Sequence, residues 1–272
     1  MSDPREALDA IGLLPDTEID IADAALQLAR VDAPEADWRA ARAHLSELAR
    51  HAVALPASDD LAERSEALSA LLATRHNYIG DTHTYDDLDN ANLIRVIERR
   101  RGLPVALGIL WMHAARAAGW GAHGVDFPAH FLVALEGKGS QAVLDVFHGG
   151  AALGARDLRV LLKQVEGEAA ELRPGLLRPM NARRVLLRLQ NNIVTRRLQS
   201  GDMDRALTCT EDMLRIAPDH AELWRQAAVM NQRLERVGAA LRCFERCLAL
   251  VPAGGAADRV RMAMEELRGR LN

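Results

Sequence analysis

The C-terminal third of the chain repeats a helix–turn–helix pattern at an interval of 34 residues. A partial third unit precedes the two full ones, at about residues 182–200. A fixed period of this kind restricts the region to a stack of similar helical pairs, each burying its apolar face against the next. Shifting the sequence by one period superimposes residues of similar kind at six positions: Ala206 on Ala240, Leu207 on Leu241, Cys209 on Cys243, Leu214 on Leu248, Ile216 on Leu250 and Pro218 on Pro252.

A helix–turn–helix period of this length that closes with proline is typical of tetratricopeptide repeats. We therefore expect residues 181–272 to form such repeats and to bind a protein or peptide in a groove. Cys209 and Cys243 hold the same repeat position, which indicates small core residues. Cys243 and Cys247 lie one helical turn apart, but no matching histidine pair accompanies them. We therefore expect no metal site there.

The composition argues against several classes of protein. Of the 272 residues 49% are hydrophobic, and the net charge of -4 offers no basic field to a nucleic acid. No run approaches the roughly 20 apolar residues of a membrane span, and the first residues show no secretory signal. The three cysteines, all near one end, argue against a disulfide framework. We therefore expect a cytoplasmic protein without nucleic-acid or membrane partners.

The N-terminal part is expected to be helical. Apolar residues recur at helical spacing in residues 19–31, 36–55 and 60–74. The next segment, residues 75–90, is polar and carries an acidic cluster at Asp86, Asp87 and Asp89. This cluster lacks the glycine and the terminal glutamate of a calcium-binding EF-hand loop. It predicts a solvated loop or a helix cap.

Two helices are expected next. The first covers residues 91–100 and ends in three arginines, where positive charge complements the helix dipole and Gly102 can supply a left-handed stop. Pro104 suits the first turn of the second helix. Residues 105–118 are apolar nearly all round, which predicts a central, buried helix.

Two alternating segments after this helix predict an antiparallel hairpin. Residues 130–136 place His130, Leu132 and Ala134 on one face, and residues 142–147 place Val143, Asp145 and Phe147 on one face. The linker between them is too short for a parallel crossover. The sequence therefore predicts a mostly α fold of the α+β class, with a helical N-terminal region and a small antiparallel sheet.

The order of central helix, histidine on a strand and aspartate on the next strand resembles papain-like and transglutaminase-like cores. Gly102, Arg116 and Gly119 fit the transglutaminase frame Gly-x-Cys, apolar helix, Arg-x-x-Gly, with Pro104 in place of the cysteine. The whole chain resembles a bacterial transglutaminase-like family with C-terminal tetratricopeptide repeats, of the invasion-regulator type. The matching segments are residues 100–104, 128–133 and 145–150. The resemblance implies a core in residues 1–180 and repeats in residues 181–272.

The resemblance also implies the roles of particular residues. His130 would act as a base and Asp145 would orient it, with Pro104 at the position of the nucleophile. Proline has no nucleophilic atom, and no serine, threonine or cysteine lies between residues 102 and 119. We therefore expect a pseudoenzyme without cofactors that acts as a protein- or peptide-binding regulator, with Asn92, Arg101 and Pro104 as binding residues.

An alternative remains open. A hydrolase could use the His130–Asp145 pair to activate water, so the sequence does not decide whether the chain is an enzyme. His113, His123 and His148 flank the pair in sequence, but their spacing matches no standard metal motif. The identity of the partner and the oligomeric state are not predicted by the sequence.

Overall fold

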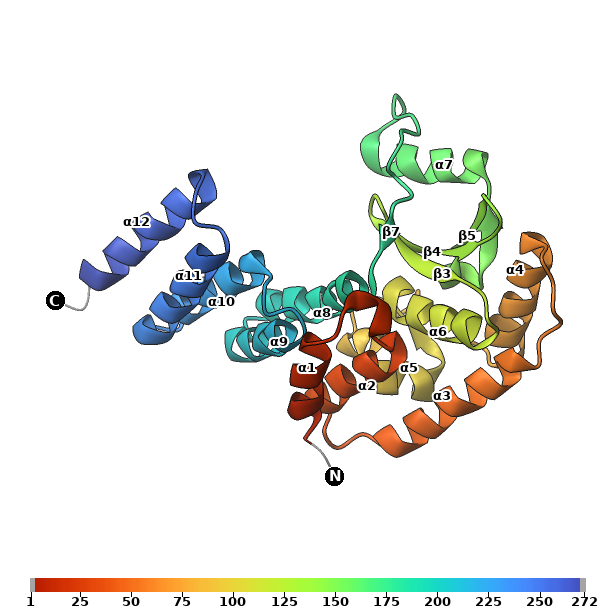
Figure 1. Cartoon of the computed structure of the whole chain (residues 1–272), viewed down its shortest axis with the longest axis horizontal. Coiled ribbons are helices and arrows are strands. Elements are labelled where there is room, and N and C mark those ends of the chain that lie inside the picture. Colours follow the sequence, from red (N-terminus) through yellow and green to blue (C-terminus); the bar gives the residue numbers. More distant parts are fainter. Residues whose placement is uncertain (1–2, 270–272) are drawn as a thin grey trace. The chain divides into compact units, whose positions relative to one another are not determined.

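The computed structural model describes residues 3–269, and the chain folds into two compact units (Figure 1). Residues 15–189 form the first, here called the core unit. Residues 3–14 and 190–269 together form the second, here called the repeat unit. This division differs from the expected boundary after residue 180 in two respects: residues 3–14 group with the repeats, and residues 181–189 group with the core.

The helices of the core unit begin where the sequence supplies a capping side chain. The side chains of Asp20, Asp37, Asp60 and Asn92 each accept hydrogen bonds from backbone N–H groups in the first turn that follows. The helices of this unit are α2 (Ile21–Asp32), α3 (Trp38–Val53), α4 (Leu61–Ser69), η2 (Ala70–Arg75), α5 (Leu93–Arg99), α6 (Pro104–Ala117) and α7 (Ala155–Glu166), with short turns η1 (Asp16–Glu18), η3 (Leu88–Ala91) and η4 (Val146–His148).

The main sheet is antiparallel throughout, in the order β6-β5-β4-β3-β7. The expected hairpin is present as β4 and β5, with Val133 opposite Leu144. A second hairpin joins β3 to β4 and places Phe127 opposite His130. The strands are β3 (Ala122–Phe127), β4 (His130–Glu136), β5 (Gln141–Asp145), β6 (Ala151–Leu153) and β7 (Pro179–Met180).

The sheet lies between two helices, α6 on one face and α7 on the other (Figure 1). Gly108 lets α6 approach the sheet closely, because a Cβ at this position would lie 2.4 Å from the ring of Phe131. The opposite face forms an apolar cluster with α7, to which Leu132 and Leu158 belong. Successive residues of β4 therefore alternate between the two faces, as expected for a buried strand.

A two-stranded parallel ribbon precedes α6. It pairs β1 (Ile79–Gly80) with β2 (Arg101–Gly102). The expected left-handed stop at Gly102 is wrong, because Arg100 adopts that conformation with φ 58°. Glycine is needed at 102 for a different reason: an added Cβ would lie 2.8 Å from Cγ2 of Val96.

The repeat unit contains the expected helical repeats. Its helices are the C-terminal part of α8 (Ala182–Gln199), α9 (Met203–Ile216), α10 (Ala221–Arg233), α11 (Val237–Leu250) and α12 (Gly255–Gly269). Phe244 and Cys247 lie in an apolar cluster with Val260 of α12. Cys209 is buried beside Gln190, which agrees with its expected role as a small core residue.

The first helix, α1 (Pro4–Gly12), packs against α9 within the repeat unit. Arg5 pairs with the buried carboxylate of Asp212 at 2.9 Å, and Asp9 pairs with Arg215 at 2.8 Å. The two helices touch at Gly12, where an added Cβ would lie 2.1 Å from the carbonyl oxygen of Arg215. The 34-residue period gives no sign of this helix, because α1 lies outside the repeated segment.

Candidate functional site

Pro104 occupies the first turn of α6, as expected, and is half-buried. No side chain caps this helix, but the turn before it is anchored by the backbone N–H of Leu103, which donates to the carbonyl of Asn90 at 2.9 Å. The proline therefore occupies the helix N-terminus at which a nucleophilic thiolate would be stabilised.

His130 lies on the sheet face opposite α6. It pairs across the hairpin with Phe127, and the two rings are 6.5 Å apart. Phe127 and Leu132 belong to the apolar cluster that α7 covers. Phe131 and Val133, the neighbours that point the other way, face Gly108 of α6. His130 therefore lies on the face of the sheet away from α6, the helix that begins at Pro104.

Asp145 ends β5 on the same face as His130, but no hydrogen bond joins their side chains in the described chain. Its Oδ2 instead accepts a hydrogen bond at 2.7 Å from Nδ1 of His148, whose side chain is 69% exposed. Its Oδ1 accepts from the backbone N–H groups of Phe147 and His148. The carboxylate therefore caps η4 and holds His148, a partner that the sequence order did not indicate.

Burial lowers the pKa of His130, and the nearby carboxylate of Asp145 opposes this effect. Positive charge on His148 and Arg188 lowers the pKa further. His130 is therefore largely neutral at pH 7. Because Asp145 makes no hydrogen bond to the neutral His130 ring, it does not fix which ring nitrogen of His130 carries the proton.

Asn92 serves as a structural cap. Its Oδ1 accepts from the backbone N–H groups of Ile94 and Arg95, and its Nδ2 donates to the carbonyl of Ala29 at 3.1 Å and to Asp32. The side chain is buried, at 2% exposure. Its Oδ1 caps α5 and its Nδ2 joins α5 to α2. The side chain therefore does not lie at an open surface beside His130.

The three consecutive arginines point in three directions. Arg99 reaches the polar loop and pairs with Asp81 at 3.0 Å. Arg100 contacts the ring nitrogen of His44 and the hydroxyl of Tyr78. Arg101 is exposed and has no ion pair in the described part of the chain. Of the three expected binding residues, Arg101 is exposed, Pro104 is half-buried and Asn92 is buried.

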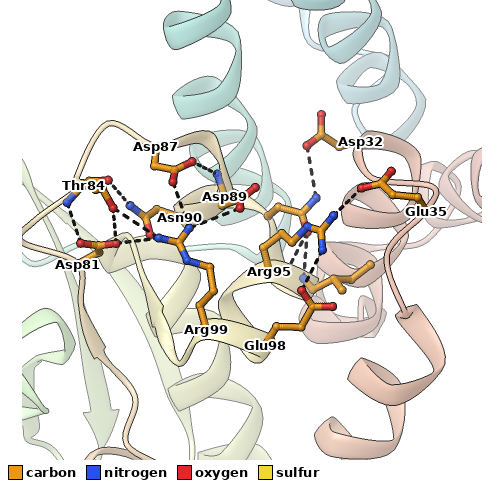
Figure 2. A network of polar contacts seen from close by, with 12 residues as sticks. Asp32, Glu35, Asp81, Thr84, Asp87, Asp89, Asn90, Arg95, Glu98 and Arg99 are labelled. Carbon is orange, nitrogen blue, oxygen red and sulfur yellow. Dashed lines mark hydrogen bonds and ion pairs between the residues drawn. The ribbon is translucent and has the colours of Figure 1, made fainter.

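Asp81 organises the polar loop that precedes α5 (Figure 2). Its carboxylate accepts from the backbone of His83 and Thr84, from the Thr84 hydroxyl and from Arg99. These hydrogen bonds, chiefly those from Thr84, lower the pKa of Asp81 to about 2, against the effect of burial. The acidic cluster at Asp87 and Asp89 also faces Arg99, so the loop is a capped, ion-paired segment.

Three histidines gather on the other side of α5. Nδ1 of His51 lies 3.1 Å from Nε2 of His76, and the rings of His44 and His76 are 5.3 Å apart. Burial and the neighbouring histidines lower the pKa of His76 to about 4. Residues 3–269 contain no cluster of histidine, cysteine or acidic side chains arranged to hold a metal ion.

The repeat unit carries an apolar groove of about 530 Å³ between α1 and the repeat helices. Leu13 forms part of it and is 86% exposed, and Leu214 and Trp224 form much of the rest. The indole of Trp224 is fixed by a hydrogen bond of 2.8 Å to the carbonyl of Pro218. Partial burial and the neighbouring Asp212 raise the pKa of Glu211 at the groove.

Two families match the chain in order. Residues 39–191 match the transglutaminase-like superfamily, and residues 195–265 match the tetratricopeptide repeat family. The chain belongs to the transglutaminase-like superfamily. The transglutaminase-like match covers α6, His130 and Asp145, and the tetratricopeptide match covers α9 to α11. The expected combination of a transglutaminase-like core with C-terminal repeats is confirmed.

Bacterial proteins match the chain over most of their length. A UPF0162 protein of Xylella fastidiosa (strain Temecula1) is 32% identical over 204 residues, which cover 74% of this chain and 73% of the relative. A UPF0162 protein of Vibrio cholerae is 26% identical over 250 residues, which cover 92% of this chain and 93% of the relative.

Among solved structures, one of menin, described as revealing its binding site for the Mixed Lineage Leukemia protein, covers 90% of this chain and 70% of its own. The TM-score of 0.42 and identity of 11% are too low to support an argument about this transglutaminase-like chain. Within residues 3–269, no helix is both long and apolar enough to cross a bilayer.

Proposed function

We propose that the chain is a cytoplasmic regulatory module that binds a protein or peptide through its repeats and does not crosslink proteins. The apolar groove of the repeat unit is the observation that carries this proposal. Tetratricopeptide repeats generally mediate protein–protein interaction, and this groove exposes Leu13 beside Leu214 and Trp224. Exposed apolar side chains arranged around a groove are typical of a site that receives an apolar anchor from a partner.

The charges at the groove indicate the partner's chemistry. Asp9 and Arg215 pair with each other, whereas Glu211 forms no ion pair within residues 3–269. Arg5, Arg215 and Arg236 act on the Glu211 carboxylate from a distance. A basic side chain on the partner would form a direct ion pair with it. We therefore expect a peptide with an apolar side chain next to lysine or arginine.

The core supports the proposal that the chain does not crosslink proteins. Pro104 carries no nucleophile, and His130 lies on the opposite face of the sheet from α6. Acyl transfer needs a nucleophile within hydrogen-bonding reach of its base. The core unit in this proposal is a scaffold derived from an enzyme fold.

A random peptide library displayed on phage provides the test. Selection against the full chain should enrich peptides that combine an apolar residue with a basic one. Leu13→Asp should weaken binding of a selected peptide by about tenfold or more, because it places a charge in an apolar contact. Met262→Asp is the matched control, since Met262 is 61% exposed on α12 and lies outside the groove.

Equal binding by the Leu13→Asp and Met262→Asp variants would refute the groove as the binding site. Enrichment of acidic peptides would refute the expected partner chemistry. Circular dichroism of both variants checks that α1 and the repeats remain folded.

The second candidate, a hydrolase, is favoured by one observation. Asp145 orients an exposed imidazole, that of His148, rather than the expected His130. A carboxylate-bound histidine at the surface can activate water. In this case p-nitrophenyl acetate hydrolysis by the wild-type chain should exceed background and fall in His148→Ala but not in His130→Ala. Equal rates in all three proteins would exclude this activity toward the ester.

A further inference from the structure

A second cavity lies within the core unit, at the C-terminal end of α6. Its volume is about 320 Å³, within the range of roughly 300–1,000 Å³ that small-molecule sites occupy. Residues from η1, α6, β3, the end of β4 and the start of α8 surround it. It lies at the other end of α6 from Pro104, so it is separate from the expected nucleophile position.

The cavity has an available cation. Arg116 lines it and is exposed, and within residues 3–269 its guanidinium makes one hydrogen bond, of 3.4 Å, to the carbonyl of Ile19. The neighbouring carboxylate of Asp16 is already occupied by Arg183 at 3.1 Å and by Asn181 at 2.6 Å. The Arg116 guanidinium can therefore donate hydrogen bonds to the carboxylate of a ligand.

An acceptor lies on the same cavity. Nδ1 of His123 bonds to Oε1 of Glu136 at 2.9 Å. A carboxylate at Nδ1 favours the proton on that nitrogen and leaves the lone pair on Nε2. Nε2 of His123 is buried and has no partner among the described residues. The other carboxylate oxygen of Glu136, Oε2, takes no part in the bond to His123. Glu136 lines the cavity with a side chain that is 57% exposed, so its carboxylate can accept a hydrogen bond from a positively charged donor.

The remaining wall is apolar and rigid. Trp120 is 7% exposed and lies beneath the guanidinium of Arg64, 5.5 Å from the centre of its ring. Met112 and Val185 line the cavity with it. An apolar group of a ligand would contact these side chains while its polar groups reach Arg116 and Glu136.

We propose that this cavity binds an α-amino acid with an apolar side chain. The ligand's carboxylate pairs with Arg116, its ammonium group donates to the carboxylate of Glu136, and its side chain packs on Trp120. This site is independent of the repeat groove, because it lies wholly within the core unit. The core unit would thus bind a small molecule, separately from the peptide bound by the repeat unit.

Three matched compounds test the proposal on the full wild-type chain. L-Phenylalanine carries both charges, 3-phenylpropionate lacks the ammonium group and 2-phenylethylamine lacks the carboxylate. Saturation-transfer NMR and calorimetric titration should show binding of L-phenylalanine. Each analogue should bind about tenfold more weakly or worse, the effect of losing one charge-assisted contact.

Two variants assign the contacts. Arg116→Gln should lower the affinity for L-phenylalanine about tenfold and leave 2-phenylethylamine unaffected, and Glu136→Gln should weaken L-phenylalanine but not 3-phenylpropionate. Arg42→Gln is the control, because Arg42 is exposed and lies outside the cavity. Lack of binding at millimolar L-phenylalanine, equal binding of the three compounds, or equal affinity in Arg116→Gln and Arg42→Gln would each overturn the proposal. If a variant unfolds, the comparison of compounds on the wild-type chain decides.

Discussion

Asp145 holds His148 through a hydrogen bond of 2.7 Å, while His130 on the same sheet face makes no hydrogen bond to it within the described chain. The carboxylate also accepts two backbone N–H groups of η4. Asp145 thus caps the turn η4. In the transglutaminase-like family the aspartate at this position would orient a base. This arrangement gives the first prediction.

A double-mutant cycle should show that Asp145 interacts with His148 more strongly than with His130. Asp145→Ala should lower the free energy of unfolding by about 1–2 kcal/mol, because it removes the cap of η4. Its coupling with His148→Ala should reach about 0.5 kcal/mol, as expected for a partly exposed pair, and should exceed its coupling with His130→Ala. Urea unfolding of the single and double variants measures both. A larger coupling to His130 would contradict the observed hydrogen bonding.

Restoring a cysteine should not restore crosslinking. Pro104→Cys would place a thiol at the N-terminus of α6, where the helix dipole lowers its pKa. His130 remains on the opposite face of the sheet, so no base is positioned to assist. Incorporation of a fluorescent amine into casein should stay at background for the wild-type chain and for Pro104→Cys. Incorporation well above background in the variant would show that the core keeps a working site.

Stability should fall as the solution is acidified from about pH 6.5 to pH 4. Burial and the charges of nearby basic groups lower the pKa of His76 from its unfolded value of 6.5 to about 4. The unfolded chain then binds more protons in this window, so the contribution is complete above pH 6.5 and is lost as the pH falls. The groups that act on this ring are Arg100 and three residues of α3, His44, His51 and Glu47. Arg75 contacts His51, and Tyr78 contacts Arg100.

His76→Gln tests this account by removing the titrating ring. Its melting temperature should vary less between pH 6.5 and pH 4 than that of the wild-type chain. The matched control is His220→Gln, because His220 is an exposed histidine of the repeat unit. An unchanged pH dependence in His76→Gln would show that other groups are responsible.

Gly12→Ala should detach α1 from α9. The added Cβ would lie 2.1 Å from the carbonyl oxygen of Arg215, a backbone atom that cannot move aside cheaply. Hydrogen exchange in residues 3–14 should accelerate, and peptide binding at the groove that contains Leu13 should weaken. Gly139→Ala is the control, because it meets no atom within 4 Å in the core unit, although its φ of 78° adds local strain. Unchanged exchange in Gly12→Ala would contradict the close contact.

The sequence predicted the elements whose patterns extend over many residues. The all-apolar α6, the hairpin of β4 and β5 and the 34-residue repeat were each recognisable, because burial imposes a period on the side chains. Proline's preference for the start of a helix also placed Pro104 correctly in the first turn of α6.

The details of the site were not predictable in the same way. Asn92 was expected to bind a partner, but its place before a helix makes it a cap, a role that its residue type alone indicates. The partner of Asp145 depends on the turn that follows β5, and His148 lies three residues away. The pairing of α1 with α9 joins segments some 200 residues apart, with no shared period to reveal it.

The most direct test of the central claim is a photo-crosslinking map with a peptide selected from the library. The photoreactive residue benzoylphenylalanine replaces Leu13 in the repeat unit or Ile79 in the core unit, and Ile79 is also exposed, at 44%. If the chain binds its partner through the repeats, the peptide crosslinks at position 13 and not at position 79. Crosslinking at position 79 alone would contradict the account and assign peptide binding to the transglutaminase-like core.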